Sequence, residues 1–201
     1  AEYLTLPAWL AHKIPESVPW EVAGVTEPFA ITTHCLVERG GLSNQDSVLI
    51  SGAATMGLMA TIWASRLGIR EIIVSGTHMD RDMRFPLALE LGATRVVDVQ
   101  DENLQQVVMD LTYGEGVEAW VECSGSGAAI NAGYALVRKT GKVVLIGLIG
   151  PATVAVPWNQ MLYKELDVVG CFSSPPSSWA KALAAEADEA EPRPLQLQAA
   201  R

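Results

Sequence analysis

The sequence predicts an α/β fold in which helices wind over both faces of a parallel sheet. Short apolar runs alternate along the chain with longer helical patterns, and glycine ends several of the helical patterns. The short runs are apolar at every position, which is typical of parallel strands covered on both sides. A strand–helix–strand series with short connections takes right-handed crossovers. We therefore expect a doubly wound parallel sheet.

The elements can be placed by their apolar runs and by glycine and proline boundaries. Helical spacing covers residues 20–39, with Pro28 as a candidate interruption and Gly40 and Gly41 after its end. A brief strand is expected at 3–6, a linker or turn at 173–178, a helix at 179–187 and a poorly ordered tail at 186–201. The expected strands of the series are 48–50, 72–74, 96–97, 119–121, 143–146 and 168–172, and the helices between them are 57–67, 86–91, 103–111 and 128–137.

Composition and charge exclude several classes of protein. The 201 residues are 49% hydrophobic, which is enough for a packed core. The 14 Lys and Arg against 23 Asp and Glu give a formal net charge of −9, which does not suit a nucleic-acid partner. No run of about 18 apolar residues predicts a membrane span, and residues 1–10 show no secretion signal. We expect a cytoplasmic protein that binds neither nucleic acid nor membrane.

The cysteines predict neither a disulfide framework nor a structural zinc site. Cys35, Cys123 and Cys171 are odd in number, far apart in the sequence and without a C-x-x-C pair. We expect three buried thiols in a reducing compartment.

A glycine-containing loop follows the first strand of the series and leads directly into a helix. In a G-x-G-x-x-G loop, the first glycine permits the tight turn, the second lets a pyrophosphate approach, and the third lets helix and strand pack closely. Gly52 and Gly57 occupy the first and third positions, and Ala54 replaces the second. The N–H groups at the start of the helix then face the phosphates. The predicted phosphate-binding residues are Gly52, Ala53, Ala54, Thr55, Met56 and Gly57; the alternative is a tight turn that binds nothing.

The end of the second strand bears on the choice of cofactor. A ribose-binding carboxylate is expected about 20 residues after the loop, but Gly76 and Thr77 stand there. Without a carboxylate, a 2′-phosphate on the adenosine is not repelled, and His78 or Arg81 could supply positive charge. This slightly favours NADP over NAD, although Asp80 and Asp82 weaken the positive field, and an ordinary surface turn remains the alternative.

Several motifs, in order along residues 1–183, resemble the zinc-type medium-chain dehydrogenase/reductase superfamily, especially its polyol (sorbitol-like) and L-threonine dehydrogenase branches. Each motif is short, and their order along the chain gives the resemblance its weight. The matching segments are Ala1-Glu2-Tyr3, Glu27-Pro28 followed by His34, Asp46 to Gly52, Glu90-Leu91-Gly92-Ala93, Val121 to Gly125, Gly141 to Gly147, Gly170 to Ser174, and Trp179 to Leu183.

The resemblance implies a Rossmann cofactor domain within an enzyme that moves hydride between a nicotinamide ring and an alcohol, polyol or ketone carbon. In the family, a zinc ion polarises the substrate oxygen. Glu27 matches an acid near that zinc and is the one candidate catalytic residue. Residues matching Ser124, Gly125, Gly147 and Leu148 line the dinucleotide, and Phe172 and Ser173 lie toward the nicotinamide.

The zinc ligands of the family lie upstream of the matched segment, in a part of the pattern that these residues do not contain. His34, Cys35 and Glu27 have no recognisable ligand spacing, so we expect no metal held by this chain. The resemblance therefore predicts a chain restricted mainly to the cofactor-binding part. We divide it into a remnant of the catalytic domain at 1–25, a dinucleotide-binding domain at 26–174, and a helix with a tail at 175–201.

Two other functions remain open from the sequence. One is a non-catalytic module that binds a dinucleotide or dimerises, because the strand 168–172 lies at a sheet edge in the family's strand order, and an open edge promotes pairing. We therefore expect a homo-oligomer. The other is a methyltransferase, which also uses a glycine-rich first loop but needs an acidic residue at the position of Gly76.

Overall fold

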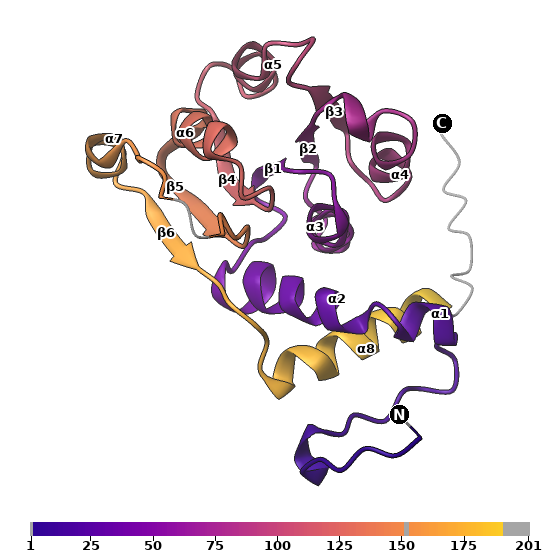
Figure 1. Cartoon of the computed structure of the whole chain (residues 1–201). Helices are drawn as coiled ribbons and strands as arrows, with labels where there is room; N and C mark the ends of the chain where they lie inside the picture. The colour runs from indigo at the N-terminus through magenta and orange to yellow at the C-terminus, as the bar shows by residue number, and fades with distance from the viewer. Residues whose placement is uncertain (1, 151–152, 191–201) are drawn as a thin grey trace.

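The computed structural model describes residues 2–150 and 153–190 and contains one six-stranded parallel sheet (Figure 1). The strand order is β3-β2-β1-β4-β5-β6, so the sheet is doubly wound and the predicted fold class is confirmed. The strands are β1 (Ser47–Ser51), β2 (Glu71–Gly76), β3 (Arg95–Asp98), β4 (Val117–Glu122), β5 (Val137–Leu145) and β6 (Asp167–Gly170).

Helices cover both faces of this sheet. The α-helices are α1 (Trp20–Ala23), α2 (Thr26–Thr32), α3 (Thr55–Arg66), α4 (Arg84–Glu90), α5 (Leu104–Leu111), α6 (Gly127–Leu136), α7 (Trp158–Tyr163) and α8 (Pro176–Ala190). Shorter or wider helical segments are η1 (Ala8–Leu10), the π-helical η2 (Thr33–Arg39) and η3 (His78–Asp80). Across residues 2–150 and 153–190, no helix has the length and apolar character needed to span a bilayer.

The core has two parts, one on each side of the sheet. Along β1, Val48 and Ile50 belong to the cluster shared with α2, α3, α4 and α8, whereas Leu49 belongs to the cluster shared with α5 and α6. All three side chains are fully buried. This explains why the strands read as continuously apolar runs, because neither face meets water.

Each strand of the expected series forms, but β5 begins at Val137, six residues before the expected start at 143. The sequence analysis did not predict α7, a short helix between β5 and β6. The residue after α7, Lys164, closes the end of α6, since its Nζ donates to the carbonyl oxygens of Tyr134, Ala135 and Val137 at 3.1, 2.8 and 2.7 Å. Helix α6 runs directly into β5 without a glycine between them, so this lysine satisfies carbonyls that a loop would otherwise cap.

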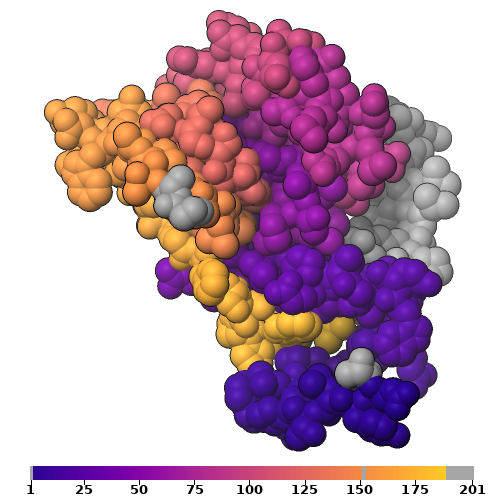
Figure 2. Space-filling view, in the orientation of Figure 1, coloured from indigo at the N-terminus to yellow at the C-terminus, as the bar shows by residue number. Residues whose placement is uncertain are grey.

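The prediction of a strand at residues 3–6 is wrong. This segment is coil and has no neighbouring strand, and Tyr3 is 91% exposed. A single extended segment has no ladder partner for its backbone, so its apolar residues alone do not make it a strand. Figure 2 shows the indigo N-terminal segment at one end of the molecule, next to the yellow C-terminal helix, where His12 stacks on Trp179 with ring centroids 5.7 Å apart.

The segment predicted to be helical at 20–39 is helical, but it is not interrupted at Pro28. The break falls at Gly24 and Val25, between α1 and α2. Pro28 is the third residue of α2, where the backbone N–H has no intrahelical acceptor, so proline is tolerated there. Gly40 follows η2, as expected.

The end of the described chain is more ordered than the sequence suggested. Residues 186–190 belong to α8, so the expectation of a poorly ordered tail is wrong for them, and residues 191–201 lie outside the described residues. Ala182 and Ala185 of α8 share the core with α2 and α3. The domain boundaries proposed at 25 and 174 stay predictions.

Candidate functional site

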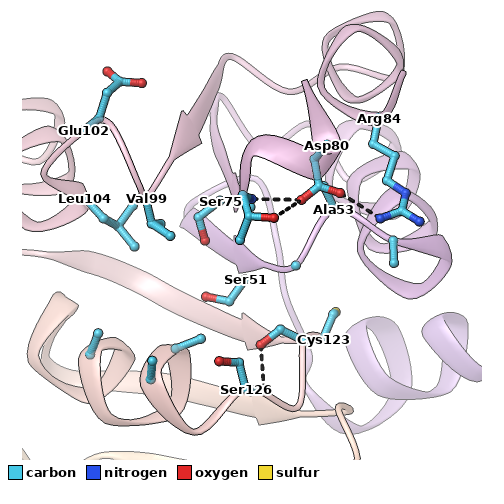
Figure 3. A pocket seen from close by; sticks show the side chains of 18 of the residues that line it. Ser51, Ala53, Ser75, Asp80, Arg84, Val99, Glu102, Leu104, Cys123 and Ser126 are labelled. Carbon is cyan, nitrogen blue, oxygen red and sulfur yellow. Dashed lines mark hydrogen bonds and ion pairs between the residues drawn. The ribbon is translucent and has the colours of Figure 1, made fainter. Parts of the chain in front are cut away.

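A large pocket lies at the carboxyl ends of β1, β2 and β4. This is the point where the strand order reverses, between β1 and β4, and where doubly wound sheets bind ligands. Its volume is about 630 Å³. Figure 3 shows it between the strand ends and helix α6. The lining residues come from four segments: 51–54, 75–84, 99–105 and 123–132.

The corner between β1 and α3 has room only for glycine at both predicted positions. Gly52 has φ +98°, in the region that favours glycine, and a Cβ there would come within 3.0 Å of Ser124. A Cβ on Gly57 would overlap the carbonyl oxygen of Gly52. The helix therefore starts as close to the strand as the backbone permits, which is the role given to these two glycines.

The backbone N–H groups of this corner are free over five consecutive residues. The N–H of Gly52 donates to Ser75 at 2.8 Å, and the next N–H that bonds is that of Leu58, which donates to Ala54 at 2.9 Å. Within residues 2–150 and 153–190, no acceptor takes a hydrogen bond from the N–H groups of Ala53, Ala54, Thr55, Met56 or Gly57. A run of unpaired N–H groups at the start of a twelve-residue helix is suited to an anion.

Ala54 narrows this corner without straining it. Its φ of −78° and ψ of −170° are ordinary extended values for an L-residue. The side chain is exposed and lines the pocket, whereas that of Ala53 is buried in the core. The added methyl group therefore takes up space in the pocket but leaves the backbone conformation unchanged.

The end of β2 brings a carboxylate and a guanidinium to the pocket wall (Figure 3). Asp80 accepts the backbone N–H of Thr77 on Oδ2 at 2.9 Å, and its Oδ1 accepts Nη1 of Arg84 at 2.8 Å. Both oxygens of Asp80 are thus already engaged, and its side chain is only 8% exposed. Arg84 is 44% exposed and keeps N–H groups for a ligand.

His78 and Arg81, the two cations expected at this place, do not line the pocket. Nδ1 of His78 lies 2.7 Å from Asp98, and Nε of Arg81 lies 2.5 Å from the same carboxylate. Arg81 also pairs with Asp101. Both side chains are therefore engaged by acids away from the pocket, and Arg84 is the cation among the residues that line it. Arg84 was not predicted, because it lies in α4, eight residues after the last residue of β2.

Glu122 positions the segment after β4, which forms another wall of the large pocket. Its side chain is buried at the end of β4, and its Oε1 accepts the backbone N–H groups of Ser124 and Gly125 at 2.9 and 3.0 Å. A Cβ on Gly147 would run into the same carboxylate. Two predicted cofactor-contact positions, Gly125 and Gly147, thus lie against one buried acid, and Ser124 reaches the pocket.

A second, smaller pocket adjoins the first. It has a volume of about 310 Å³ and shares Cys123 with the larger pocket. Met56, Gly147, Leu148, Phe172 and Ser173, all predicted cofactor contacts, line it together with Ile31, Ile146 and Cys171. The structure thus unites residues that the sequence places more than a hundred positions apart.

The predicted residues fall into four groups by place. Gly52, Ala53, Ala54, Gly76, Thr77 and Ser124 line the large pocket, and Met56, Gly147, Leu148, Phe172 and Ser173 line the small one. Thr55, Gly57 and Gly125 shape the walls through their backbone without lining either pocket. His78, Arg81 and Glu27 line neither. Glu27 is exposed in the first turn of α2, one helical turn before Ile31 of the small pocket.

One cluster of side chains among the described residues has the donor atoms that a metal ion would need. His78, Asp98 and Asp101 bring three donor atoms within 4.8 Å of one another. Arg81 already bonds both of these acids, so a dication would have to displace its guanidinium. The cluster does not line the small pocket. We therefore assign no zinc-binding role to the described residues.

Comparison with known proteins settles the family. Residues 55–188 match the family model described as zinc-binding dehydrogenase. The chain belongs to this family. The prediction from the motifs is confirmed, and with it the Rossmann-type fold.

Individual relatives agree. The L-threonine 3-dehydrogenase of Burkholderia multivorans is 37% identical over 172 residues, which are 86% of this chain and 48% of that protein. Alcohol dehydrogenase TADH from Thermus sp. ATN1 superposes with a TM-score of 0.81 at 25% identity, over 90% of this chain and 52% of that one. A zinc-binding dehydrogenase from Sinorhizobium meliloti 1021 bound to NADP superposes with a TM-score of 0.77 at 26% identity. The match covers 89% of this chain and 52% of that one. The chain thus spans about half the length of the relatives it matches.

Proposed function

We propose that this chain binds a nicotinamide dinucleotide, NADP in preference to NAD, as the cofactor-binding part of an alcohol-, polyol- or threonine-type dehydrogenase. The observation that carries the proposal is the run of five unbonded N–H groups, Ala53 to Gly57, at the start of α3. A diphosphate needs several donors and a positive helix end, and this corner provides both.

The two pockets supply one place for each half of a dinucleotide. The large pocket reaches from the β1 corner to Thr77 and Arg84 and takes the adenosine half. The small pocket, with Leu148, Phe172 and Ser173, takes the nicotinamide half. Because both include Cys123, a diphosphate at the β1–α3 corner can bridge them.

Arg84 supports the preference for NADP. A 2′-phosphate on the adenosine ribose lies at the end of β2 in folds of this type. There, both oxygens of Asp80 are engaged by Thr77 and Arg84, so neither is free to accept ribose hydroxyls. The guanidinium of Arg84 remains half-exposed and can donate to a phosphate.

The reacting end of the site is apolar. A bound nicotinamide supplies hydride transfer, and the side chains of Ile31, Ile146 and Leu148 exclude water from the ring. Glu27, one turn from Ile31 on α2, is the described residue that we propose for contact with the substrate side. The substrate is a small alcohol or polyol, in keeping with the family.

Titration with NADPH and with NADH tests the proposal. We expect saturable enhancement of nicotinamide fluorescence and a rise in the thermal midpoint with both cofactors, and tighter binding of NADPH. No response to either cofactor at millimolar concentration contradicts the proposal. Equal affinities contradict only the preference for NADP.

A second candidate is a non-catalytic module that binds the dinucleotide and self-associates. The observation in its favour is β6, which pairs only with β5, lies at the edge of the sheet and has Val168 39% exposed. We propose that two copies pair along this edge whether or not the chain is catalytic. Sedimentation of the wild type and of Val168→Lys tests this: a dimer that the substitution dissociates supports the pairing, and a monomeric wild type contradicts it.

A further inference from the structure

Three cysteines that are distant in the sequence meet beside the small pocket. Cys35 lies in η2 and is fully buried, and both Cys123 and Cys171 pack against the core cluster that contains it. Cys171 directly follows β6 and lines the small pocket together with Cys123. Each of the three is a free thiol.

Two of these thiols form a pair. The thiols of Cys35 and Cys171 lie close enough to each other to shift each other's ionisation. The segments that carry them also touch nearby, where Nη2 of Arg39, at the end of η2, lies 3.5 Å from the carbonyl oxygen of Gly170. Cys171 is held in place by its N–H, which donates to Leu145 at 3.0 Å.

The two members of the pair differ chemically. The neighbouring thiol of Cys35 lowers the pKa of Cys171, and the charges of His34 and Arg39 act in the same direction against partial burial. The thiol of Cys171, together with burial, raises the pKa of Cys35. Burial and the neighbouring Glu122 also raise the pKa of Cys123. Of the three thiols, Cys171 is therefore the one that ionises most readily, and the thiolate is the nucleophilic form of cysteine.

We propose that Cys171 and Cys35 form a peroxide-sensitive dithiol at the wall of the small pocket, with Cys171 as the attacking and Cys35 as the resolving thiol. The thiolate of Cys171 attacks one oxygen of a hydroperoxide, the O–O bond breaks, and an alkoxide or hydroxide leaves with the electron pair. The thiol of Cys35 then attacks the sulfenic acid of Cys171, the S–S bond forms, and water leaves. The two thiols are oxidised by two electrons and the hydroperoxide is reduced by two.

Access favours this division of roles. A small hydroperoxide reaches Cys171 through the pocket that it lines, whereas Cys35 is out of contact with solvent. The resolving step needs no solvent, because Cys35 already lies beside Cys171. The disulfide would join η2 to the residue after β6, next to Phe172 in the wall of the small pocket. Reduction by a dithiol restores both thiols.

Peptide mapping of the wild-type chain tests the proposal directly. Trypsin places the three cysteines in separate peptides, 14–39, 96–138 and 165–181. The reduced chain is treated with hydrogen peroxide, its remaining thiols are alkylated, and it is digested without reduction. We expect peptides 14–39 and 165–181 joined, lighter by two hydrogen atoms than their sum, with Cys123 alkylated. Dithiothreitol should abolish this species.

Three results overturn the proposal: a bond that joins peptides 96–138 and 165–181, sulfinic acid on Cys171 without any internal bond, or thiols that all stay alkylatable. None of them bears on dinucleotide binding, since no cofactor is present in the experiment.

Variants separate the two steps. Cys123→Ser should still form the bond between Cys35 and Cys171, because Cys123 takes no part in it. Cys35→Ser should stop at the sulfenic acid, which dimedone traps on peptide 165–181. If Cys35→Ser reacts no faster with dimedone than the wild type after peroxide, the role of Cys35 as the resolving thiol is contradicted.

Discussion

The two pockets are built in different ways. The large pocket includes the β1–α3 corner, which has unbonded backbone N–H groups and whose geometry is set by two glycines, Gly52 and Gly57. The small pocket is formed by residues of α2 and α3 and of the segments that follow β4, β5 and β6, and two of their side chains, Leu148 and Phe172, are 76% and 80% exposed. An added Cβ disrupts such a backbone corner, whereas exposed side chains tolerate change.

Gly57→Ala should have the largest effect. A Cβ there overlaps the carbonyl oxygen of Gly52, so strand and helix must separate. We expect a loss of about 3 kcal/mol or more of unfolding free energy, and no measurable NADPH binding. Chemical denaturation and fluorescence titration measure both. Ala54→Gly is the matched control, since it removes a methyl group from the same loop and should tighten binding. Wild-type binding by Gly57→Ala contradicts the backbone account.

Glu38→Gln tests the contact between η2 and α8. Glu38, on η2, accepts from Ser178 at 2.8 Å and from Lys181 at 2.7 Å on α8, and lies 2.9 Å from Nδ1 of His34. Although burial opposes it, the hydrogen bonds from Lys181, His34 and Ser178 lower the pKa of Glu38 to about 2 from 4.5. We expect the variant to lose about 1–3 kcal/mol at neutral pH.

The pH dependence of this loss follows from the sign of the shift. Because the pKa is lowered in the folded chain, the stabilisation by Glu38 is complete above about pH 4.5 and disappears as the pH falls toward about 2. Urea denaturation across this range should show the curves of wild type and Glu38→Gln converging at the acid end. A constant difference between the two curves contradicts the assignment.

Arg84→Gln tests the adenosine end of the large pocket. If the guanidinium of Arg84 binds the 2′-phosphate, its loss should weaken NADPH binding about tenfold, which equals about 1.4 kcal/mol. NADH, which has no 2′-phosphate, should bind as before. Arg81→Gln is the matched control, because Arg81 pairs with Asp98 and Asp101 outside the pocket. Equal losses for NADPH and NADH would falsify the assignment of Arg84 to the phosphate.

Phe172→Ala should have the smallest effect. The ring is 80% exposed, so its removal costs little packing in the free chain. We expect NADPH affinity to fall by less than about threefold, or roughly 0.6 kcal/mol, while the fluorescence of the bound nicotinamide changes. A large loss of affinity would show that the small pocket, and not the backbone corner, dominates binding.

The sequence predicts the parts of this molecule that depend on neighbours along the chain. The apolar strands, the helices between them and the glycine corner all follow from local pattern, because burial on both faces and close helix–strand approach each require particular residue types in sequence. The same logic failed at residues 3–6, where apolar residues have no strand to pair with.

What the sequence did not predict depends on the folded arrangement. Arg84 reaches the pocket only because η3 turns the chain back after β2. His78 and Arg81, nearer in sequence, are drawn to the acids at Asp98 and Asp101. The pairing of Cys35 with Cys171 needs the edge strand to lie beside η2, and no spacing in the chain encodes that distance.

The central claim is that the backbone N–H groups of Ala53 to Gly57 bind the diphosphate. Backbone amide NMR of the ¹⁵N-labelled chain, titrated with NADPH, tests it most directly. The account predicts that the resonances of Ala53, Ala54, Thr55, Met56 and Gly57 shift together and saturate, with larger changes than at His78, which does not line the pocket. Saturable binding that leaves these five resonances in place would contradict it.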